Sequence, residues 1–464
     1  MRCPTRARPL PALAGALAFS AVFALVACGD DSGDSGPTNP TPDPVDVGIE
    51  FFFPSWADAT PDTVVELVHD DDLSDSENGD RLRDAFLALT PGMHLRIGEG
   101  TWAVASQLRI DVAADADAPV FVEGAGTIPP LIVRPNTLQN LIDVGLTASA
   151  RAVAIRGLDL RGGVEVIRLH DATDVWVDDC RLSAASGSGI STAPFLHRRI
   201  RVTRCTITGL GENGPGIVLG QAGGTERTEE AVIVANTIHD LTGPFSRGIL
   251  LHPGSTGSVR RNVVRNVDGA GIVLFGSDDA ASTVWRNRVL DVGGPGIQVT
   301  RRVVVRNNVV LQTAGAAFLS NERILDGERR LRPGFVDLIN NTFVSASGPT
   351  AVRLQGWMSG EASGTTMQGN AILTRDGIAL RSDTPTSVIG LLNAISGPVD
   401  GIDEGFYVGN GLDDFVALTW DLRSTDVIPA AGSALLDQLD DDLPFDIDGR
   451  VRRPPYDAGA VERP

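Results

Sequence analysis

A short repeat recurs along most of the chain, and it constrains the fold more than any other feature. From about residue 150 onward, a run rich in Val and Ile leads to a small residue or Asn, a second short run, a Gly-rich turn and a strand that begins Gly-Ile. These runs are short and alternate as strands do, whereas helical hairpins would show a 3.6-residue period over longer runs. Repeats of this kind must stack, because no single repeat can bury its apolar side alone.

The residue between the first two runs marks the register of the repeat. This position is occupied in turn by Gly157, Cys180, Cys205, Asn236, Asn262, Asn287, Asn308, Asn341 and Asn370. If each repeat is one coil, equal positions lie above one another at the parallel-strand spacing of about 4.8 Å. The six Asn then form a ladder that stabilises the turns. The sequence therefore predicts an all-β chain, a single right-handed parallel β-helix of about 11–12 coils over residues 49–420.

The strand after each Gly-rich turn predicts one inward row and two outward rows of side chains. The inward row is Ile167, Ile190, Ile217, Ile249, Ile272, Ile297, Phe318, Val352 and Ile378. The first outward row is Arg168, Ser191, Val218, Leu250, Val273, Gln298, Leu319, Arg353 and Ala379. The second is His170, Ala193, Gly220, His252, Phe275, Thr300, Asn321, Gln355 and Arg381. The outward rows form a long, shallow face.

Both ends of such a solenoid need covers, because an open coil end is an exposed sheet edge. At the N-terminal end we predict a capping helix of about ten residues with Asp80 as its N-cap. Its apolar face would hold Leu82, Ala85, Phe86 and Leu89, and Pro91-Gly92 would end it. At the other end, residues 421–464 form an irregular C-terminal capping segment.

The N-terminal residues are typical of an export signal. Three arginines precede an apolar stretch from Ala12 to Val26, which is of signal-peptide length. Leu25-Val26-Ala27-Cys28 resembles the bacterial lipobox, which implies cleavage after residue 27 and lipidation of Cys28; an ordinary signal peptide with a chance cysteine is the alternative. Residues 28–48 form an acidic tether without large apolar side chains. We therefore expect an exported protein held at the bacterial outer membrane or cell surface by its lipid.

Two further segments resemble known β-helical families. The predicted helix and the run MHLRIGEGTWAV are similar to the start of polysaccharide lyases of the alginate lyase and chondroitinase B type, with Met93 where those have Asp and Trp102 where those have Tyr. The C-terminus resembles the closing segment of choice-of-anchor Q proteins, a family defined by architecture. The matching residues are Asp448, Gly449, Arg452, Asp457, Gly459, Ala460 and Glu462.

The composition excludes some classes of binding partner and some catalytic groups. The formal net charge of −20 argues against a nucleic-acid partner, because phosphate binding requires a basic surface. All 39 basic residues are Arg, so no lysine is available to any mechanism. Cys180 and Cys205 lie on adjacent coils, where they form either a stacked thiol pair or a disulfide. No cysteine spacing indicates zinc.

Arginines gather in the C-terminal half of the outward face. Residues 301–332 hold seven Arg against three acids, a local balance of 7 − 3 = +4. Guanidinium groups bind carboxylates and sulfates through two parallel hydrogen bonds. We predict a groove for an anionic polysaccharide with the binding residues Arg301, Arg302, Arg323, Gln355, Trp357 and Arg381. The alternative is a solvated loop whose charges balance nearby acids.

The catalytic residues are not determined by the sequence, and the candidates for proton transfer are His252, Asp278, Asp279 and Arg353. The Asp278-Asp279 pair is similar to the paired aspartates of β-helical polygalacturonases, whose further His and Arg-Lys motifs this chain lacks. A lyase of the alginate type would need a base and a cation such as Ca²⁺, and lysine is excluded as that base. Two hypotheses follow: a carbohydrate-active lyase or hydrolase, or a non-catalytic adhesion, glycan-binding or structural envelope protein. In either case we expect a monomer.

Overall fold

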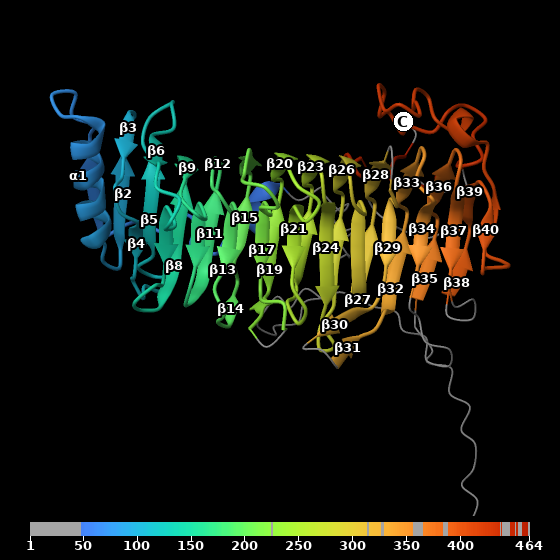
Figure 1. Ribbon diagram of the computed structural model, residues 1–464, viewed down its shortest axis with the longest axis horizontal. Coiled ribbons are helices and arrows are strands. Elements are labelled where there is room, and N and C mark those ends of the chain that lie inside the picture. The colour runs from blue at the N-terminus through green and yellow to red at the C-terminus, as the bar shows by residue number, and fades with distance from the viewer. Residues whose placement is uncertain are drawn as a thin grey trace, which may run out of the picture. The chain divides into compact units, whose positions relative to one another are not determined.

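The computed structural model describes residues 48–223, 226–312, 315–325, 329–355, 365–383, 388–436, 438, 446–450, 452 and 457–462. They belong to one compact unit that spans Asp46–Pro464. This unit is a parallel β-helix, in which the strands of successive coils lie side by side (Figure 1). The predicted signal peptide, Cys28 and the tether up to residue 47 lie outside the described residues.

Each full coil contributes one strand to each of three faces. Face 1 follows the Gly-rich turn and consists of β4 (Leu108–Ile110), β7 (Ile142–Val144), β10 (Ile167–Leu169), β13 (Ile190–Thr192), β17 (Ile217–Leu219), β21 (Arg247–Leu251), β24 (Ala270–Gly276), the first half of β27 (Ile297–Arg306), β29 (Phe318–Ser320), β34 (Thr350–Leu354), β37 (Ile378–Ser382) and β40 (Val399–Asp400).

Face 2 follows face 1 along the chain. It consists of β1 (Thr63–Leu67), β2 (Met93–Ile97), β5 (Val120–Gly124), β8 (Ala150–Arg156), β11 (Ala172–Asp178), β15 (Arg201–Thr203), β19 (Ala231–Val234), β22 (Gly257–Arg260), β25 (Ser282–Trp285), the second half of β27, β32 (Gly334–Ile339), β35 (Thr365–Gln368) and β38 (Val388–Leu391). Two short strands, β14 (His197–Arg198) and β18 (Thr228–Glu229), pair beside β11.

Face 3 is a 13-stranded parallel sheet of its own. It consists of β3 (Thr101–Ala103), β6 (Leu131–Arg134), β9 (Asp159–Gly162), β12 (Arg181–Ser183), β16 (Thr206–Thr208), β20 (Thr237–Leu241), β23 (Val263–Val267), β26 (Arg288–Val292), β28 (Val309–Gln312), β33 (Thr342–Ser345), β36 (Ala371–Thr374), β39 (Asn393–Ser396) and β41 (Phe406–Val408).

The inward row of face 1 is confirmed except at its last member. Ile167, Ile190, Ile217, Ile249, Ile272, Ile297, Phe318 and Val352 are register partners in turn, and all are fully buried. In the next coil Val352 pairs with Leu380, while Ile378 pairs with Thr350. The predicted register was therefore wrong by two residues there. Arg381 lies in the first outward row beside Arg353, in the place predicted for Ala379.

The asparagine ladder lies at the turn between faces 2 and 3. Asn236 Nδ2 donates to Asn262 Oδ1 at 2.9 Å, and the same bond repeats from each Asn to the next. Asn393, which the sequence reading missed, extends the ladder by one rung. Each amide nitrogen also donates to a backbone carbonyl, as Asn287 does to Val259. Every polar atom of these buried side chains thus has a partner, which makes a polar ladder compatible with the core.

The two cysteines precede the first Asn in the same row. Cys180 and Cys205 are both buried and both free, so the stacked thiol pair is correct and the disulfide alternative is wrong. Burial raises the pKa of the Cys205 thiol well above its ordinary value. The pair therefore belongs to the packed turn, as the asparagines do.

The capping helix is present, but it starts earlier than predicted. It is α1 (Asp75–Leu87), and its N-cap is Ser74, which forms a capping box with Glu77. Asp80 lies inside the helix, so its assignment as N-cap was wrong. Leu82 and Phe86 are buried as predicted, while Leu89 is buried beyond the helix end.

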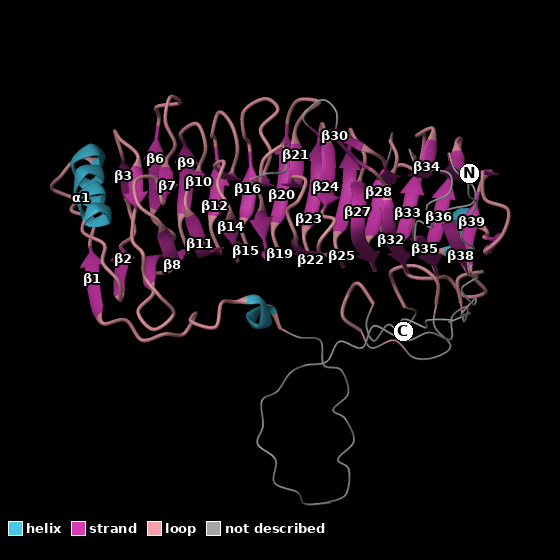
Figure 2. Cartoon of the chain, turned by 90° about the horizontal axis from the view of Figure 1, so that it is seen from below, coloured by secondary structure: helices cyan, strands magenta, loops and turns pink. Residues whose placement is uncertain are grey.

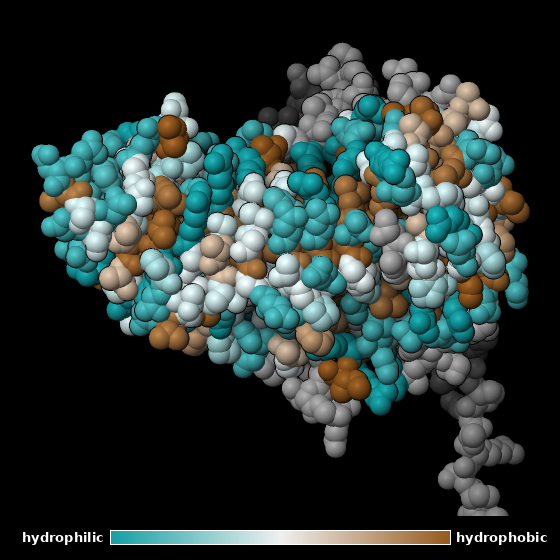
Figure 3. All heavy atoms as spheres, turned by 45° about the horizontal axis from the view of Figure 1, so that its top comes forward, coloured by the Kyte–Doolittle hydropathy of each residue, from teal (hydrophilic) through white to brown (hydrophobic). Residues whose placement is uncertain are grey.

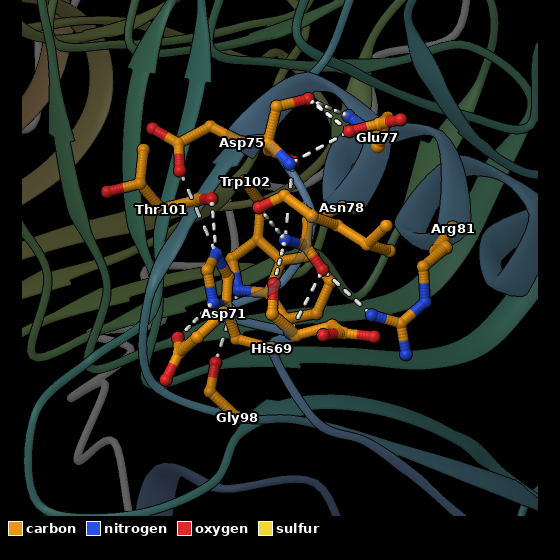
Figure 4. A network of polar contacts seen from close by, with 12 residues as sticks. His69, Asp71, Asp75, Glu77, Asn78, Arg81, Gly98, Thr101 and Trp102 are labelled. Carbon is orange, nitrogen blue, oxygen red and sulfur yellow. Dashed lines mark hydrogen bonds and ion pairs between the residues drawn. The ribbon is translucent and has the colours of Figure 1, made fainter.

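A polar network joins α1 to the first coils (Figure 4). Asn78, which is fully buried on α1, donates to Asp70 O at 2.9 Å and accepts from Asp70 N. The ring of His69 meets that of Trp102 edge-on at 5.4 Å, and its Nε2 lies 3.1 Å from Thr101 O. Trp102 Nε1 donates to Gly98 O. These bonds satisfy the backbone at an end that would otherwise be open.

The segment before β1 packs on the outer side of face 2. It begins with a single 3-10 turn, η1 (Ile49–Phe52), and runs back along the strands to β1 (Figure 2). Phe53 lies 4.8 Å from the ring of Trp176, and Trp56 contacts both Trp176 and Phe121. The guanidinium of Arg204 lies over Phe53 and that of Arg260 over Phe52. These aromatic contacts fix residues 52–56 against four coils.

The C-terminal segment packs on the outer side of face 3. After a last 3-10 turn, η3 (Gly411–Asp414), residues Phe415, Leu418, Val427, Leu435 and Ile447 cover Val309, Val344, Leu373 and neighbouring outward side chains. Arg452 is buried and donates to Asp457 O, Gly459 O and the Glu462 carboxylate. Two carboxylates of the motif, Asp457 and Glu462, are buried, as is Asp446 just before it, whereas Asp448 is exposed and pairs with Arg288.

Candidate functional site

Face 1 brings one predicted residue, His252, into a small cluster with an aromatic ring and an arginine. His252 follows β21, and its ring stacks on Phe275 of β24 at a centroid distance of 6.4 Å. The guanidinium of Arg323 lies 4.9 Å from the centre of the Phe275 ring. We call His252, Phe275, Arg323 and the neighbouring Arg247 the His252 cluster.

A two-stranded hairpin places Arg323 in this cluster. The hairpin consists of the antiparallel strands β30 (Arg323–Leu325) and β31 (Arg329–Leu331), inserted between β29 and β32 (Figure 1). Its last residue, Leu331, is buried against Ala270, Val273 and Phe275 of β24. The insertion therefore packs on face 1 across its middle coils, and this contact with β24 fixes the base of the hairpin.

The electrostatics of the His252 cluster are dominated by burial and by like charge. Burial, together with the positive charge of Arg323, lowers the pKa of His252 to about 4, so its imidazole is neutral at pH 7. The pKa of Arg247 is also lowered, by burial and then by Arg323. His252 Nδ1 is buried without a hydrogen-bond partner. Among the described residues, neither Arg247 nor Arg323 has an acidic partner, although the guanidinium of Arg247 donates to the backbone carbonyls of Pro244 and Ser246.

The two predicted carboxylates do not act as a pair. Asp278 and Asp279 follow β24 and point to different arginines: Asp278 Oδ1 lies 2.5 Å from Arg301 Nε, and Asp279 Oδ2 lies 3.7 Å from an Arg227 Nη. Both carboxylates are more than half exposed. Glycoside hydrolysis needs two carboxyl groups facing one bond, so this arrangement does not support it.

Arg301 and Arg302 lie at the middle of β27, where face 1 gives way to face 2. Arg302 has positive φ, and its guanidinium stacks on Phe335 of β32 at 4.7 Å, with Arg301 over the same ring at 5.5 Å. Arg301 is already paired with Asp278. These two arginines therefore flank the His252 cluster instead of lining it.

Arg353, Gln355 and Arg381 lie at the C-terminal end of the same face. Arg353 is the register partner of Leu319, four coils beyond Leu250, which is about 19 Å along the stack. Its Nε is buried without a partner, whereas Arg381 faces Asp383 and Asp400 at 3.6 and 3.4 Å. Trp357 lies outside the described residues. The predicted site residues thus share one face but do not converge on one point.

The sequence reading missed a second polar cluster, at the N-terminal end of face 1. His170 Nε2 lies 2.8 Å from Asp143 Oδ1, and Asp143 is 2% exposed. Asn140 Nδ2 donates to the same oxygen at 2.7 Å. His170 was placed in the second outward row, but Asp143 belongs to the coil before the rows begin. Extending the rows back by one coil from Ile167 would have found it, since Asp143 is the register partner of Arg168.

No metal centre accompanies these clusters within the described ranges: no three His, Cys, Asp or Glu side chains there lie close enough to hold an ion. In the same residues, none of the helices has the length and apolar composition needed to cross a bilayer. On the side of the molecule seen in Figure 3, hydrophobic residues occur in small groups separated by hydrophilic ones. Such a mixed surface differs from the continuous apolar patch that marks an obligate protein interface.

The pH dependence of the free energy of unfolding should depend on the buried, neutral state of His252. Its pKa is near 4 in the fold and near 6.5 when unfolded, so the unfolded chain binds the proton more readily as pH falls from 6.5 through 4. Between pH 7 and pH 4, we expect the free energy of unfolding of the wild type to fall by about 2–3 kcal/mol more than that of His252→Gln. Urea unfolding at both pH values measures the difference. An unchanged acid dependence in the variant would contradict the buried, neutral imidazole.

Comparisons with known proteins agree with the architecture. A family model described as a right handed beta helix region matches residues 197–372. No curated protein sequence matches the chain. The fold is therefore a right-handed β-helix, as predicted.

Similar solved structures include three proteins that act on polysaccharides. A pectate lyase is 12% identical, with 88% of this chain and 98% of that chain covered and a TM-score of 0.48. The A-module of a mannuronan C-5 epimerase from Azotobacter vinelandii is 14% identical, with 75% and 98% covered and a TM-score of 0.50. An alginate lyase of the PL6 family is 14% identical, with 74% and 53% covered and a TM-score of 0.44, so this chain spans about half of it. At these identities the likeness extends to the fold alone.

Proposed function

We propose that this protein binds an anionic polysaccharide along face 1, with the His252 cluster as the central contact. The observation that carries the proposal is the pair Arg247 and Arg323, which lie close enough for Arg323 to lower the pKa of Arg247. Neither has an acidic partner among the described residues, although the chain as a whole carries a net charge of −20. Two like charges held together in this way are stabilised by an anion between or beside them.

The rest of the cluster suits a sugar acid. Guanidinium groups bind a carboxylate or sulfate through two parallel hydrogen bonds. The buried ring of Phe275 supports the guanidinium of Arg323 from below, and neutral His252 adds no further positive charge at pH 7. A polymer running along face 1 would reach Arg353, whose Nε is also without a partner, about four coils on. The repeated carboxylates of such a polysaccharide could pair with arginines that recur along face 1.

The location of the protein belongs to the same proposal. We infer that the chain is exported, cleaved before Cys28 and lipidated there, and that residues 28–48 tether the β-helix to the bacterial outer membrane or cell surface. A glycan-binding face held there by a polar tether would meet extracellular or envelope polysaccharides. Mass spectrometry of the mature protein from a bacterial host would show diacyl or triacyl Cys28 as its first residue, and an uncleaved or unmodified chain would contradict this part.

A binding measurement with a matched variant tests the central contact. Alginate and polygalacturonate are suitable anionic probes, because the mannuronan epimerase module with this fold acts on a uronate polymer, and dextran serves as the neutral control. We expect the wild-type protein to bind an anionic probe in 50 mM salt, and Arg323→Gln to weaken it about tenfold, the loss of one charge-assisted contact. Isothermal titration calorimetry measures both constants.

Arg181→Gln is the control, because Arg181 is an exposed arginine on face 3 with the same charge and no part in the cluster. Its affinity should stay within twofold of wild type. Equal losses in both variants would mean that affinity follows net charge alone. Failure of the wild type to bind either uronate polymer would contradict the proposal.

A further inference from the structure

The N-terminal end of face 1 holds a histidine–carboxylate pair with the form of a proton-transfer site. Asp143 on β7 is 2% exposed and accepts from Asn140 and from His170 Nε2. This bond places the proton of a neutral His170 on Nε2, which leaves the lone pair of Nδ1 as the basic atom. The buried Arg134 is close enough to interact electrostatically with Asp143. Asp143 therefore fixes the ring and its tautomer.

The neighbouring carboxylate, Glu165, has hydrogen-bond partners of its own. Glu165 accepts from Arg168 Nη1 at 2.7 and 2.9 Å and from the hydroxyl of Ser191. With Asp143 bound to His170 and Asn140, neither carboxylate is available as a hydrolytic acid or nucleophile. The chain has no lysine. The imidazole of His170 is thus the base that this cluster offers.

The register leaves space around that imidazole. In the second outward row His170 lies between Gly145 and Ala193, and the following coil carries Gly220. No side chain larger than a methyl group flanks His170 in this row on either adjacent coil. The imidazole, with its side chain 18% exposed, can therefore be reached by a chain lying along face 1. The same row continues to His252.

We propose that His170 is the base of a β-elimination on a uronate polysaccharide bound at face 1, with Asp143 as its positioning residue. Nδ1 of His170 takes the proton from C5 of a uronate, and the C–H electron pair forms the C4=C5 double bond. The bond between C4 and the glycosidic oxygen breaks, and its electron pair stays on that oxygen. The leaving oxygen then takes the proton back from the imidazolium, which Asp143 has stabilised. One glycosidic bond is broken, one double bond is formed, and no oxidant, reductant or water is consumed.

This inference rests on the proposed function, so binding and turnover are measured on the same samples. Wild-type protein, His170→Ala and Asp143→Asn are incubated with alginate and with polygalacturonate, with and without Ca²⁺, and unsaturated ends are followed by ultraviolet absorbance. We expect product from the wild type, a drop in kcat of about 100-fold or more in His170→Ala, and a smaller drop in Asp143→Asn. Affinity should stay within twofold. Imidazole added to His170→Ala should restore part of the rate, which a structural role of His170 would not allow.

His239→Ala is the matched control, because His239 on face 3 forms the same kind of pair with Asp240 at 2.7 Å. Its turnover should equal that of wild type. Binding without unsaturated product in the wild type, or unchanged turnover in His170→Ala, overturns the role of His170 and leaves the proposed binding function intact. Absence of binding to both polymers removes both.

Discussion

Replacing Asn287 by Ala is expected to destabilise the protein by several hydrogen bonds at once. The Asn287 side chain makes four buried hydrogen bonds: Oδ1 accepts from Asn262 N and Nδ2, and Nδ2 donates to Val259 O and Asn308 Oδ1, each at 2.9 or 3.0 Å. Alanine would leave these partners buried and unpaired, which costs on the order of 4 kcal/mol in total. Urea unfolding followed by circular dichroism measures this loss.

Asn136→Ala is the control for the ladder, since Asn136 is exposed and makes a single bond, to Leu138 N in a turn. It should cost less than about 1 kcal/mol. Similar losses in the two variants would mean that the ladder does not stabilise the coils beyond an ordinary turn. The unfolding transition of a solenoid can be broad, so both midpoint and slope are compared.

Replacing Arg452 by Met is expected to release the C-terminal segment from face 3. Arg452 is 3% exposed and joins Glu462 to the carbonyls of Asp457 and Gly459. Without it, Glu462 would remain as a buried charge that has lost its arginine, a change that costs about 3–5 kcal/mol when one partner of a buried pair is removed. The apolar contacts of the segment with Val344 and Leu373 would then no longer offset the cost of the unpaired Glu462 charge.

Amide hydrogen exchange at Ala460 measures this release directly, because Ala460 N donates to Thr342 Oγ1 on β33. The amide should exchange at least 100-fold faster in Arg452→Met, the fold-change that corresponds to about 3 kcal/mol. Arg450→Met is the control, since the Arg450 side chain is nearly half exposed. Slow exchange in Arg452→Met would show that apolar contacts alone hold the segment.

The sequence predicts the coil architecture well because the core and ladder repeat, but it cannot fix every register. Ile378 follows a Gly, as other members of the inward row do, and a strand shifted by two residues keeps the same side chains inward. The hydrophobic pattern therefore fits Ile378 and Leu380 equally, and only the strand pairing decides for Leu380. This ambiguity misplaced Arg381 by one row.

The capping helix shows a different limit. Ser74 and Glu77 carry a capping-box spacing that the sequence does display. The helix start was placed at Asp80 instead, because the first turns hold no large apolar residue and so give no amphipathic period. Local capping chemistry was the better guide here than hydrophobic pattern.

The candidate site was predictable only in part, because it depends on an insertion. The outward rows correctly place His252 near Phe275, one coil apart. The position of Arg323, however, follows from the packing of Leu331 on β24, and strand register says nothing about where a hairpin folds. The Asp143–His170 pair was within reach of the same row argument, had the rows included the coil of Ile142.

Hydrogen exchange in the presence of bound alginate tests most directly the claim that face 1 is the binding face. The account predicts slower exchange in β21, β24 and the β30–β31 hairpin, which surround the His252 cluster, with no change in the strands of face 3. Protection confined to face 3 or to the segment on face 2, with face 1 unchanged while alginate is bound, would contradict it.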